Sequence, residues 1–260
     1  MARTARKKSA SGVYHVVLRG INKQSIFFDE EDREVFLNRL KLAKSEEDKK
    51  SGNVKKNFEL YAFCLMTNHI HLLVKEEALT VGNMFRKILS SYVYWYNQKY
   101  KRVGNLFQDR FRSDAITNDS HMLCALRYIH QNPLKAGMVK SVGDYKWSSH
   151  SAYKSKADSF VDTELALEML GGVARYEEFM RDIETERFSE DERLIVLSDE
   201  DVSETIKEIM QVKNIYDLQK CSRAEIEEVI STLWQKAPLA SIRQVSRITG
   251  ISVSIVRYIE

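Results

Sequence analysis

The chain has 260 residues, of which 43% are hydrophobic and 30% charged, and this length suffices for one or two domains with a full core. Its widely spaced cysteines exclude a disulfide framework, and no apolar run is long enough for a membrane span or a signal peptide, so we expect a cytoplasmic protein without membrane partners. The net charge is only +3, but residues 80–140 hold ten Lys and Arg against three acids, which favours a polyanionic partner such as nucleic acid.

The first part of the chain predicts strands and one helix. The β-branched run at 13–18 predicts a strand, and the periodic apolar residues at 29–44, which follow acidic side chains, predict a helix. The polar, lysine-rich stretch 45–57 predicts a loop. Two apolar runs, 58–66 and 69–74, flank Thr67-Asn68 and predict an antiparallel hairpin.

The next part predicts two helices around a further strand. A long helix is expected over 81–100 and a turn with a strand over 104–116. A helix over 121–131 must then stop near Pro133, because proline cannot continue the hydrogen-bond ladder. This order of elements predicts an α+β fold, in which helices cover an antiparallel sheet.

Past Tyr153 the pattern changes to an all-helical C-terminal region. Ser222 and Glu225 form a capping box ahead of a helix that Pro238 ends. Residues 241–259 then show the helix, glycine turn and helix of a helix-turn-helix, although any two packed helices can share this layout. We therefore divide the chain into a domain at 1–155, a helical linker region at 156–221 and a helix-turn-helix-like DNA-binding segment at 222–260.

The motif Asn68-His69-Ile70-His71 carries the first chemical signal. Alternate side chains of a strand point to the same face, so His69 and His71 project together while the residues between them can pack into a core. Two imidazoles on one face suggest a metal site, but histidines in strands are also often simply packed. The spacing alone leaves both interpretations open.

A metal site in a basic protein points to phosphodiester chemistry, which requires a nucleophile. Tyr128 of the predicted helix 121–131 and Asn132, the residue directly after it, stand at i and i+4 and would therefore share a face. A phenol oxygen and a third metal ligand could be presented there together. The chain has 12 tyrosines, however, and spacing does not distinguish a nucleophile from a structural residue.

Four motifs in order resemble the single-tyrosine HUH transposases of insertion sequences, and most of all their REP-associated tyrosine transposase branch: NHIHLLV, GNLFQDRFRS, RYIHQNPLKAGMV and YKWSSHSAY. The resemblance covers residues 12–153. It implies a ferredoxin-like or RRM-like HUH core, with His69 and His71 as metal ligands and Tyr128 as the nucleophile. It makes Asn132 the third ligand, while the adjacent Gln131 stays an alternative.

The resemblance also implies an activity and its partners. The enzyme would cleave and rejoin single-stranded or hairpin DNA through a 5′-phosphotyrosine, with Mg²⁺ or Mn²⁺ as cofactor, although two imidazoles could equally hold zinc. Both monomers and homodimers occur among such transposases. Candidate phosphate contacts are Arg19, Arg110, Arg112 and Arg127, and candidate base-stacking residues are Tyr96, Phe107 and Phe111.

Two other functions stay open from the sequence. A catalytically idle DNA-binding regulator, derived from a transposase, would use the basic half and the helix-turn-helix-like segment. A metal-dependent hydrolase would instead use activated water, and Tyr128 would then be dispensable.

Overall fold

The computed structural model describes residues 8–47, 53–155, 160–181, 197–212, 214–237, 239–257 and 259. The chain forms two compact units, which we call the sheet unit (Met1–Thr117 and Ile129–Asp162) and the helical unit (Asn118–Tyr128 and Thr163–Glu260). The division predicted from the sequence, at residues 155 and 221, stays a prediction.

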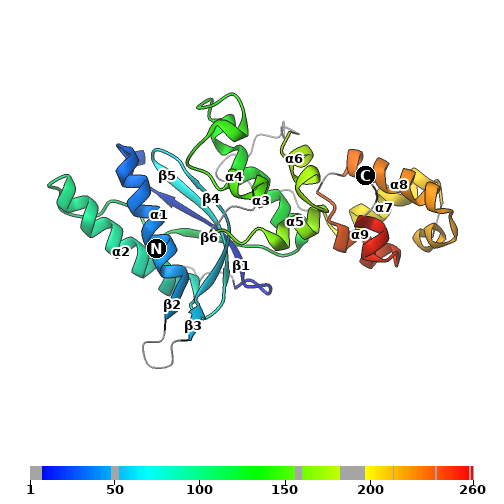
Figure 1. Ribbon diagram of the computed structural model, residues 1–260, viewed down its shortest axis with the longest axis horizontal. Coiled ribbons are helices and arrows are strands. Elements are labelled where there is room, and N and C mark those ends of the chain that lie inside the picture. Colours follow the sequence, from blue (N-terminus) through cyan, green and yellow to red (C-terminus); the bar gives the residue numbers. More distant parts are fainter. Residues whose placement is uncertain are drawn as a thin grey trace, which may run out of the picture. The chain divides into compact units, whose positions relative to one another are not determined.

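An antiparallel four-stranded sheet forms the centre of the sheet unit (Figure 1). It consists of β1 (Val13–Arg19), β4 (Phe58–Leu65), β5 (His69–Glu76) and β6 (Arg112–Ala115) in the order β4-β5-β1-β6. Alternate residues of the two inner strands form one fully buried apolar face that includes Val16, Leu18, Ile70 and Leu72. The α+β fold and the hairpin of β4 and β5 are confirmed, while β6 is shorter than the predicted strand.

Two helices, α1 (Glu30–Lys44) and α2 (Val81–Lys99), lie side by side against this sheet (Figure 1). Asp29 caps α1 through a capping box, and the Thr80 hydroxyl caps α2. The apolar stripe of α2 is buried as its periodicity predicts, and the Tyr92 hydroxyl donates a hydrogen bond to the carbonyl of Ile26. Both predicted helices are therefore confirmed.

The stretch 45–57 is not simply the loop that its polarity predicts. Ser45–Glu47 forms β2 and Val54–Lys56 forms β3, and the two strands pair antiparallel. Glu46 lies directly opposite Lys55, so opposite charges meet across the ladder and stabilise the pair. Lys55, which in isolation indicated a loop, thus lies opposite an acidic residue of the strand that directly follows α1. Residues 48–52 of the predicted loop lie outside the described residues.

Helix α3 (Asp119–Lys135) continues past Pro133, so the predicted stop near this proline is wrong. A proline removes only its own N–H from the ladder. The carbonyl of Asn132 still accepts a hydrogen bond from the Ala136 N–H, and that of Pro133 accepts one from Met138. The last turn of α3 therefore closes around the proline, and Asn132 lies inside the helix.

Shorter helices complete the two units. The sheet unit also holds η1 (Ile21–Lys23), η2 (Val142–Asp144) and α4 (His150–Lys154). The remaining helices belong to the helical unit: α5 (Glu164–Leu170), α6 (Val173–Arg181), α7 (Asp199–Met210), η3 (Ile215–Lys220), α8 (Arg223–Lys236), α9 (Ile242–Thr249) and α10 (Val253–Arg257). None of the helices in the described ranges is both long and apolar enough to cross a lipid bilayer.

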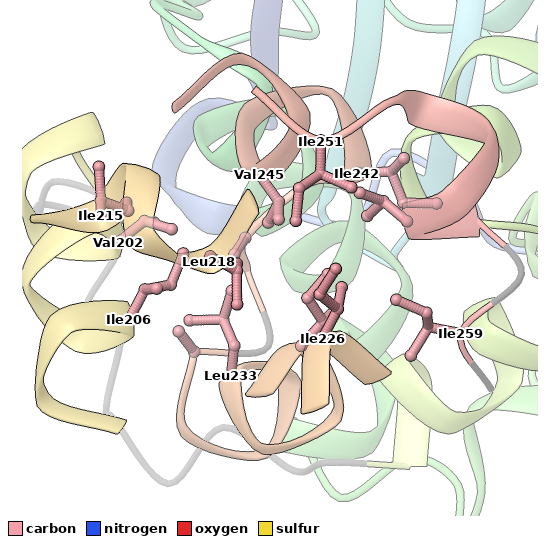
Figure 2. Close-up of a cluster of buried hydrophobic side chains, with 14 residues drawn as sticks. Val202, Ile206, Ile215, Leu218, Ile226, Leu233, Ile242, Val245, Ile251 and Ile259 are labelled. Carbon is pink, nitrogen blue, oxygen red and sulfur yellow. The ribbon is translucent and has the colours of Figure 1, made fainter. Parts of the chain in front are cut away.

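A single apolar cluster connects α7 to α10 within the helical unit (Figure 2). Val202, Ile206, Leu233 and Val245 are among its fully buried members. The predicted capping box of Ser222 and Glu225 is confirmed at the start of α8, whereas Pro238 lies outside the described residues. Gly250 has a φ of +73° and separates α9 from α10, as the predicted glycine turn requires.

Candidate active site

Strand β5 places His69 and His71 on the same face of the sheet, opposite to the apolar face of Ile70 and Leu72. Their rings meet edge to face with centroids 4.9 Å apart. In the neighbouring strand β1, Arg19 pairs in register with His69 and therefore projects from the same face. The alternation of the HxH strand thus gathers two imidazoles and a guanidinium in one place.

Asn132 of α3 approaches these histidines. Its side-chain oxygen Oδ1 lies 3.4 Å from Nε2 of His69. This contact supports Asn132 as the amide beside the HxH pair, while Gln131 is fully buried one position earlier on the helix. Across the part of the chain that the structure describes, no three or more His, Cys, Asp or Glu residues are placed to hold a metal ion.

Burial determines the charge state of both histidines. It lowers the pKa of His71 well below 6.5, and the nearby His15, His69 and Arg19 act in the same direction. Burial also lowers the pKa of His69, with Arg19 assisting and the Asn132 contact opposing. Both imidazoles are consequently neutral near pH 7, which leaves the ring able to act as a nitrogen ligand.

His15 is a member of this site that the sequence interpretation missed. Its Nε2 lies 3.1 Å from Nδ1 of His71, and the two rings stack with centroids 5.3 Å apart. The signal was present in the first predicted strand, because His15 and Arg19 stand four residues apart and must share a face. Only the pairing of β1 with β5 brings that face beside the HxH motif.

Tyr128 lies on the same helix as Asn132 and precedes it by four residues, which is about one helical turn. Its side chain is buried, with 7% of its surface exposed. The division between the two units falls directly after Tyr128, within the continuous helix α3. The prediction that one helix carries both residues is confirmed.

The predicted arginines are placed in different environments. Arg19 is partly buried beside His69, Arg110 is exposed, and Arg112 is exposed and forms an ion pair with Asp114 at 3.1 Å. Arg127 is only 3% exposed, and its guanidinium lies over the ring of Phe179 at 4.6 Å. The first three are accessible to a phosphate backbone, while Arg127 is engaged in packing.

The three aromatic residues predicted to stack on bases are instead core residues. Tyr96 is fully buried and donates a hydrogen bond to the carbonyl of Ser25. Phe107 and Phe111 are each 9% exposed, and Phe111 packs on Phe85 with ring centroids 5.0 Å apart. None of the three lies in the strand β6, because Tyr96 belongs to α2 and β6 begins only at Arg112. Packing against neighbouring elements buries all three, so the stacking prediction is wrong for them.

The buried residues His130 and Ser149 hold the C-terminal part of α3 against the sheet. Nε2 of His130 lies 2.7 Å from the hydroxyl of Ser149, and that hydroxyl accepts a hydrogen bond from the Phe63 N–H of β4 at 2.9 Å. The Ser149 N–H in turn donates to the Phe63 carbonyl at 3.0 Å. Ser149 therefore connects the edge of β4 to the helix that carries Asn132.

Comparisons with known proteins show which family part of the chain resembles. Residues 8–132 match the family described as "Transposase IS200 like". A REP-associated tyrosine transposase by name, from Haemophilus influenzae, is 33% identical over 104 residues, which are 35% of this chain and 58% of the relative. The chain thus matches little more than half of that relative's length.

A solved structure, described as a REP-associated tyrosine transposase bound to a REP hairpin, shares the fold. It has a TM-score of 0.51 and 19% identity, and the match covers 75% of this chain and 99% of that chain. At this identity the likeness shows the fold alone. Together the comparisons confirm the resemblance read from the four motifs.

Proposed function

We propose, from the premise that residues 8–132 form an IS200-like transposase domain, that the chain cuts single-stranded DNA and rejoins it through a phosphotyrosine. The observation that carries this proposal is the convergence of His69, His71 and Asn132, with Tyr128 one turn before Asn132 on the same helix. The solved relative holds a REP hairpin, and this supports hairpin DNA as the class of substrate.

The donor set fits a divalent cation. It offers two imidazole nitrogens, which burial keeps neutral, and one amide oxygen. His69, His71 and Asn132 would hold the ion, with Mg²⁺ or Mn²⁺ as the expected cofactor. When bound, such an ion supplies Lewis-acid polarisation of the scissile phosphate. The phosphate and water would complete its coordination, as is usual for these ions.

Tyr128 is the proposed nucleophile of the cleavage step. Its phenol oxygen forms a bond to phosphorus, and the bond from phosphorus to the 3′ oxygen breaks. The phenolic proton passes to solvent, and the departing oxygen takes up a proton to become a 3′-hydroxyl. The reverse reaction rejoins a strand, because the phosphotyrosine conserves the energy of the broken ester. The cycle therefore needs no nucleotide cofactor.

Three arginines are candidates to position the DNA backbone. Arg19 pairs with His69 on the same face of the sheet. Arg112 is the first residue of β6 and Arg110 precedes it by two, and both are exposed. Guanidinium groups bind phosphate oxygens without reading sequence. We propose that these three contact phosphates, and that Arg127 acts through packing, since it lies against Phe179.

A cleavage assay with labelled hairpin-bearing single-stranded DNA and Mg²⁺ tests the proposal. We expect a covalent adduct on a denaturing gel that Tyr128→Phe abolishes, because the variant lacks the attacking oxygen. Tyr94→Phe is the matched control, since Tyr94 is 71% exposed on α2 and should leave the adduct unchanged. Cleavage that survives Tyr128→Phe would refute the tyrosine mechanism and favour a hydrolase that uses activated water.

A DNA-binding regulator is the second candidate, and the α9–α10 pair is the observation that favours it. These helices and the Gly250 turn have the order of a helix-turn-helix. Arg243 and Arg257 pair with Glu168, and Arg247 pairs with Asp199, so phosphate contacts there would have to replace existing ion pairs. Binding of hairpin DNA without cleavage would support this candidate.

A further inference from the structure

Asn68, the residue before the HxH pair, has no role in the chemistry described so far. Its side chain is held at both ends of the carboxamide. The nitrogen Nδ2 donates a hydrogen bond to the carbonyl of Lys23 at 3.2 Å, and the oxygen Oδ1 lies 2.7 Å from Nδ1 of His69. The Asn68 carbonyl also accepts from the Gly20 N–H at 2.9 Å, so backbone and side chain are both fixed.

These contacts determine which nitrogen of His69 carries the proton. A carbonyl can only accept, so the end of the amide that faces Lys23 must be the NH₂ group. The oxygen of Asn68 therefore faces the imidazole, and Nδ1 must donate to it. In the neutral ring the other nitrogen, Nε2, then retains its lone pair.

The location of that lone pair matters because Nε2 faces Asn132. The amide oxygen of Asn132, 3.4 Å away, is itself an acceptor. If Nε2 carried the proton instead, His69 could donate a hydrogen bond to the Asn132 oxygen. The two proposed ligands would then bind each other, and Nε2 would have no lone pair for an ion. With the proton on Nδ1, both atoms can donate lone pairs to one cation.

The second histidine has the same arrangement. His71 turns its Nδ1 toward Nε2 of His15 at 3.1 Å, so both HxH residues direct Nδ1 toward a protein partner. Metal-binding histidines commonly use one ring nitrogen for the ion and the other for such a partner, which fixes the tautomer and the ring orientation. In His69 that partner is the preceding residue of the same motif.

We propose that Asn68 is a positioning residue that holds His69 as the Nδ1–H tautomer and so reserves Nε2, together with the Asn132 oxygen, for a divalent cation. The inference rests on the metal site of the proposed function. The direction of the hydrogen bond between His69 Nδ1 and Asn68 Oδ1 can be measured separately, in the metal-free protein.

The test uses the full chain labelled with ¹⁵N and two substitutions, Asn68→Ala and Asn68→Asp. Long-range ¹H–¹⁵N spectra at pH 8 report the tautomer of His69 without metal, and Mn²⁺ titration reports affinity. Asn68 is only partly buried, so both variants should fold. The aspartate variant is the matched control, because its carboxylate still accepts from Nδ1.

We expect the unaltered chain and Asn68→Asp to show the Nδ1–H form. Asn68→Ala should populate the Nε2–H form, and its Mn²⁺ dissociation constant should rise by about 10- to 100-fold. A wild-type tautomer in Asn68→Ala would overturn the role of Asn68 while leaving the metal site intact. No Mn²⁺ binding by the unaltered chain would instead overturn the metal site of the proposed function, whatever the tautomer.

Discussion

Ser149 connects the edge strand β4 to α3, so its replacement tests how the fold holds Asn132 beside the histidines. Its buried hydroxyl accepts from the Phe63 N–H at 2.9 Å and contacts His130 Nε2 at 2.7 Å. In Ser149→Ala the buried Phe63 N–H loses its acceptor, which costs about 1–3 kcal/mol, and the lost His130 contact adds about 1 kcal/mol. We therefore expect the free energy of unfolding to fall by about 2–4 kcal/mol.

Urea unfolding followed by circular dichroism measures this change. Ser151→Ala is the matched control, since Ser151 lies two residues further along, in the first turn of α4, but is exposed. This variant should leave the unfolding free energy nearly unchanged. We also expect Ser149→Ala to weaken Mn²⁺ binding, because the last turns of α3 lose a contact with the sheet. A stability equal to that of Ser151→Ala would refute the reasoning.

Three further predictions concern the same two units. Gly250→Ala should lower the unfolding free energy by about 2–3 kcal/mol, since it strains a left-handed turn. The new Cβ would also displace the side chain of Gln219, whose Nε2 donates a hydrogen bond to the Thr249 carbonyl. Gly137→Ala, with a φ of +69° and no neighbour within 4 Å, should cost less in the same urea assay, and an equal cost would contradict the Gln219 argument. Because burial lowers the pKa of His71 and His130 well below 6.5, the unfolded chain binds more protons below that pH, so stability should fall with acid. The slope should reach about 1.4 kcal/mol per pH unit for each histidine, and a flat urea profile between about pH 6.5 and 5.5 would be inconsistent with buried neutral rings. His15→Phe keeps a ring to stack on His71 but removes the nitrogen that faces Nδ1, so we expect Mn²⁺ affinity in a titration to fall by about 10-fold; unchanged affinity would exclude a role for His15.

Local patterns in the sequence predicted much of the sheet unit. The alternation around His69 and His71 determines which side chains share a face, and this rule holds without knowledge of the neighbours. The acidic residues at the start of α1 and the capping box of Ser222 likewise indicated helix starts from local sequence alone. The helix that carries Tyr128 and Asn132 was likewise visible from its periodicity.

Features that depend on distant partners could not be predicted in this way. His15 enters the site only because β1 pairs with β5, a register that no local pattern specifies. Tyr96 and Phe107 looked accessible beside basic residues, but the packing of other elements buries them. Lys55 indicated a loop until Glu46 was known to lie opposite. In each case the missing information was a contact between residues far apart in the chain.

The histidines of the candidate site stand on the two inner strands of the sheet. Strand β5 is bonded to β4 and β1, and β1 is bonded to β5 and β6, so neither has an open edge near His15 or His71. Amide protons in such strands exchange with solvent only when the domain opens widely. The spacing between the imidazoles of His69 and His71 is thus set when the sheet folds, and the two rings need little rearrangement to bind an ion. A rigid pair of nitrogens selects among cations by size and preferred geometry, and the movable partner in that choice is the Asn132 side chain on α3.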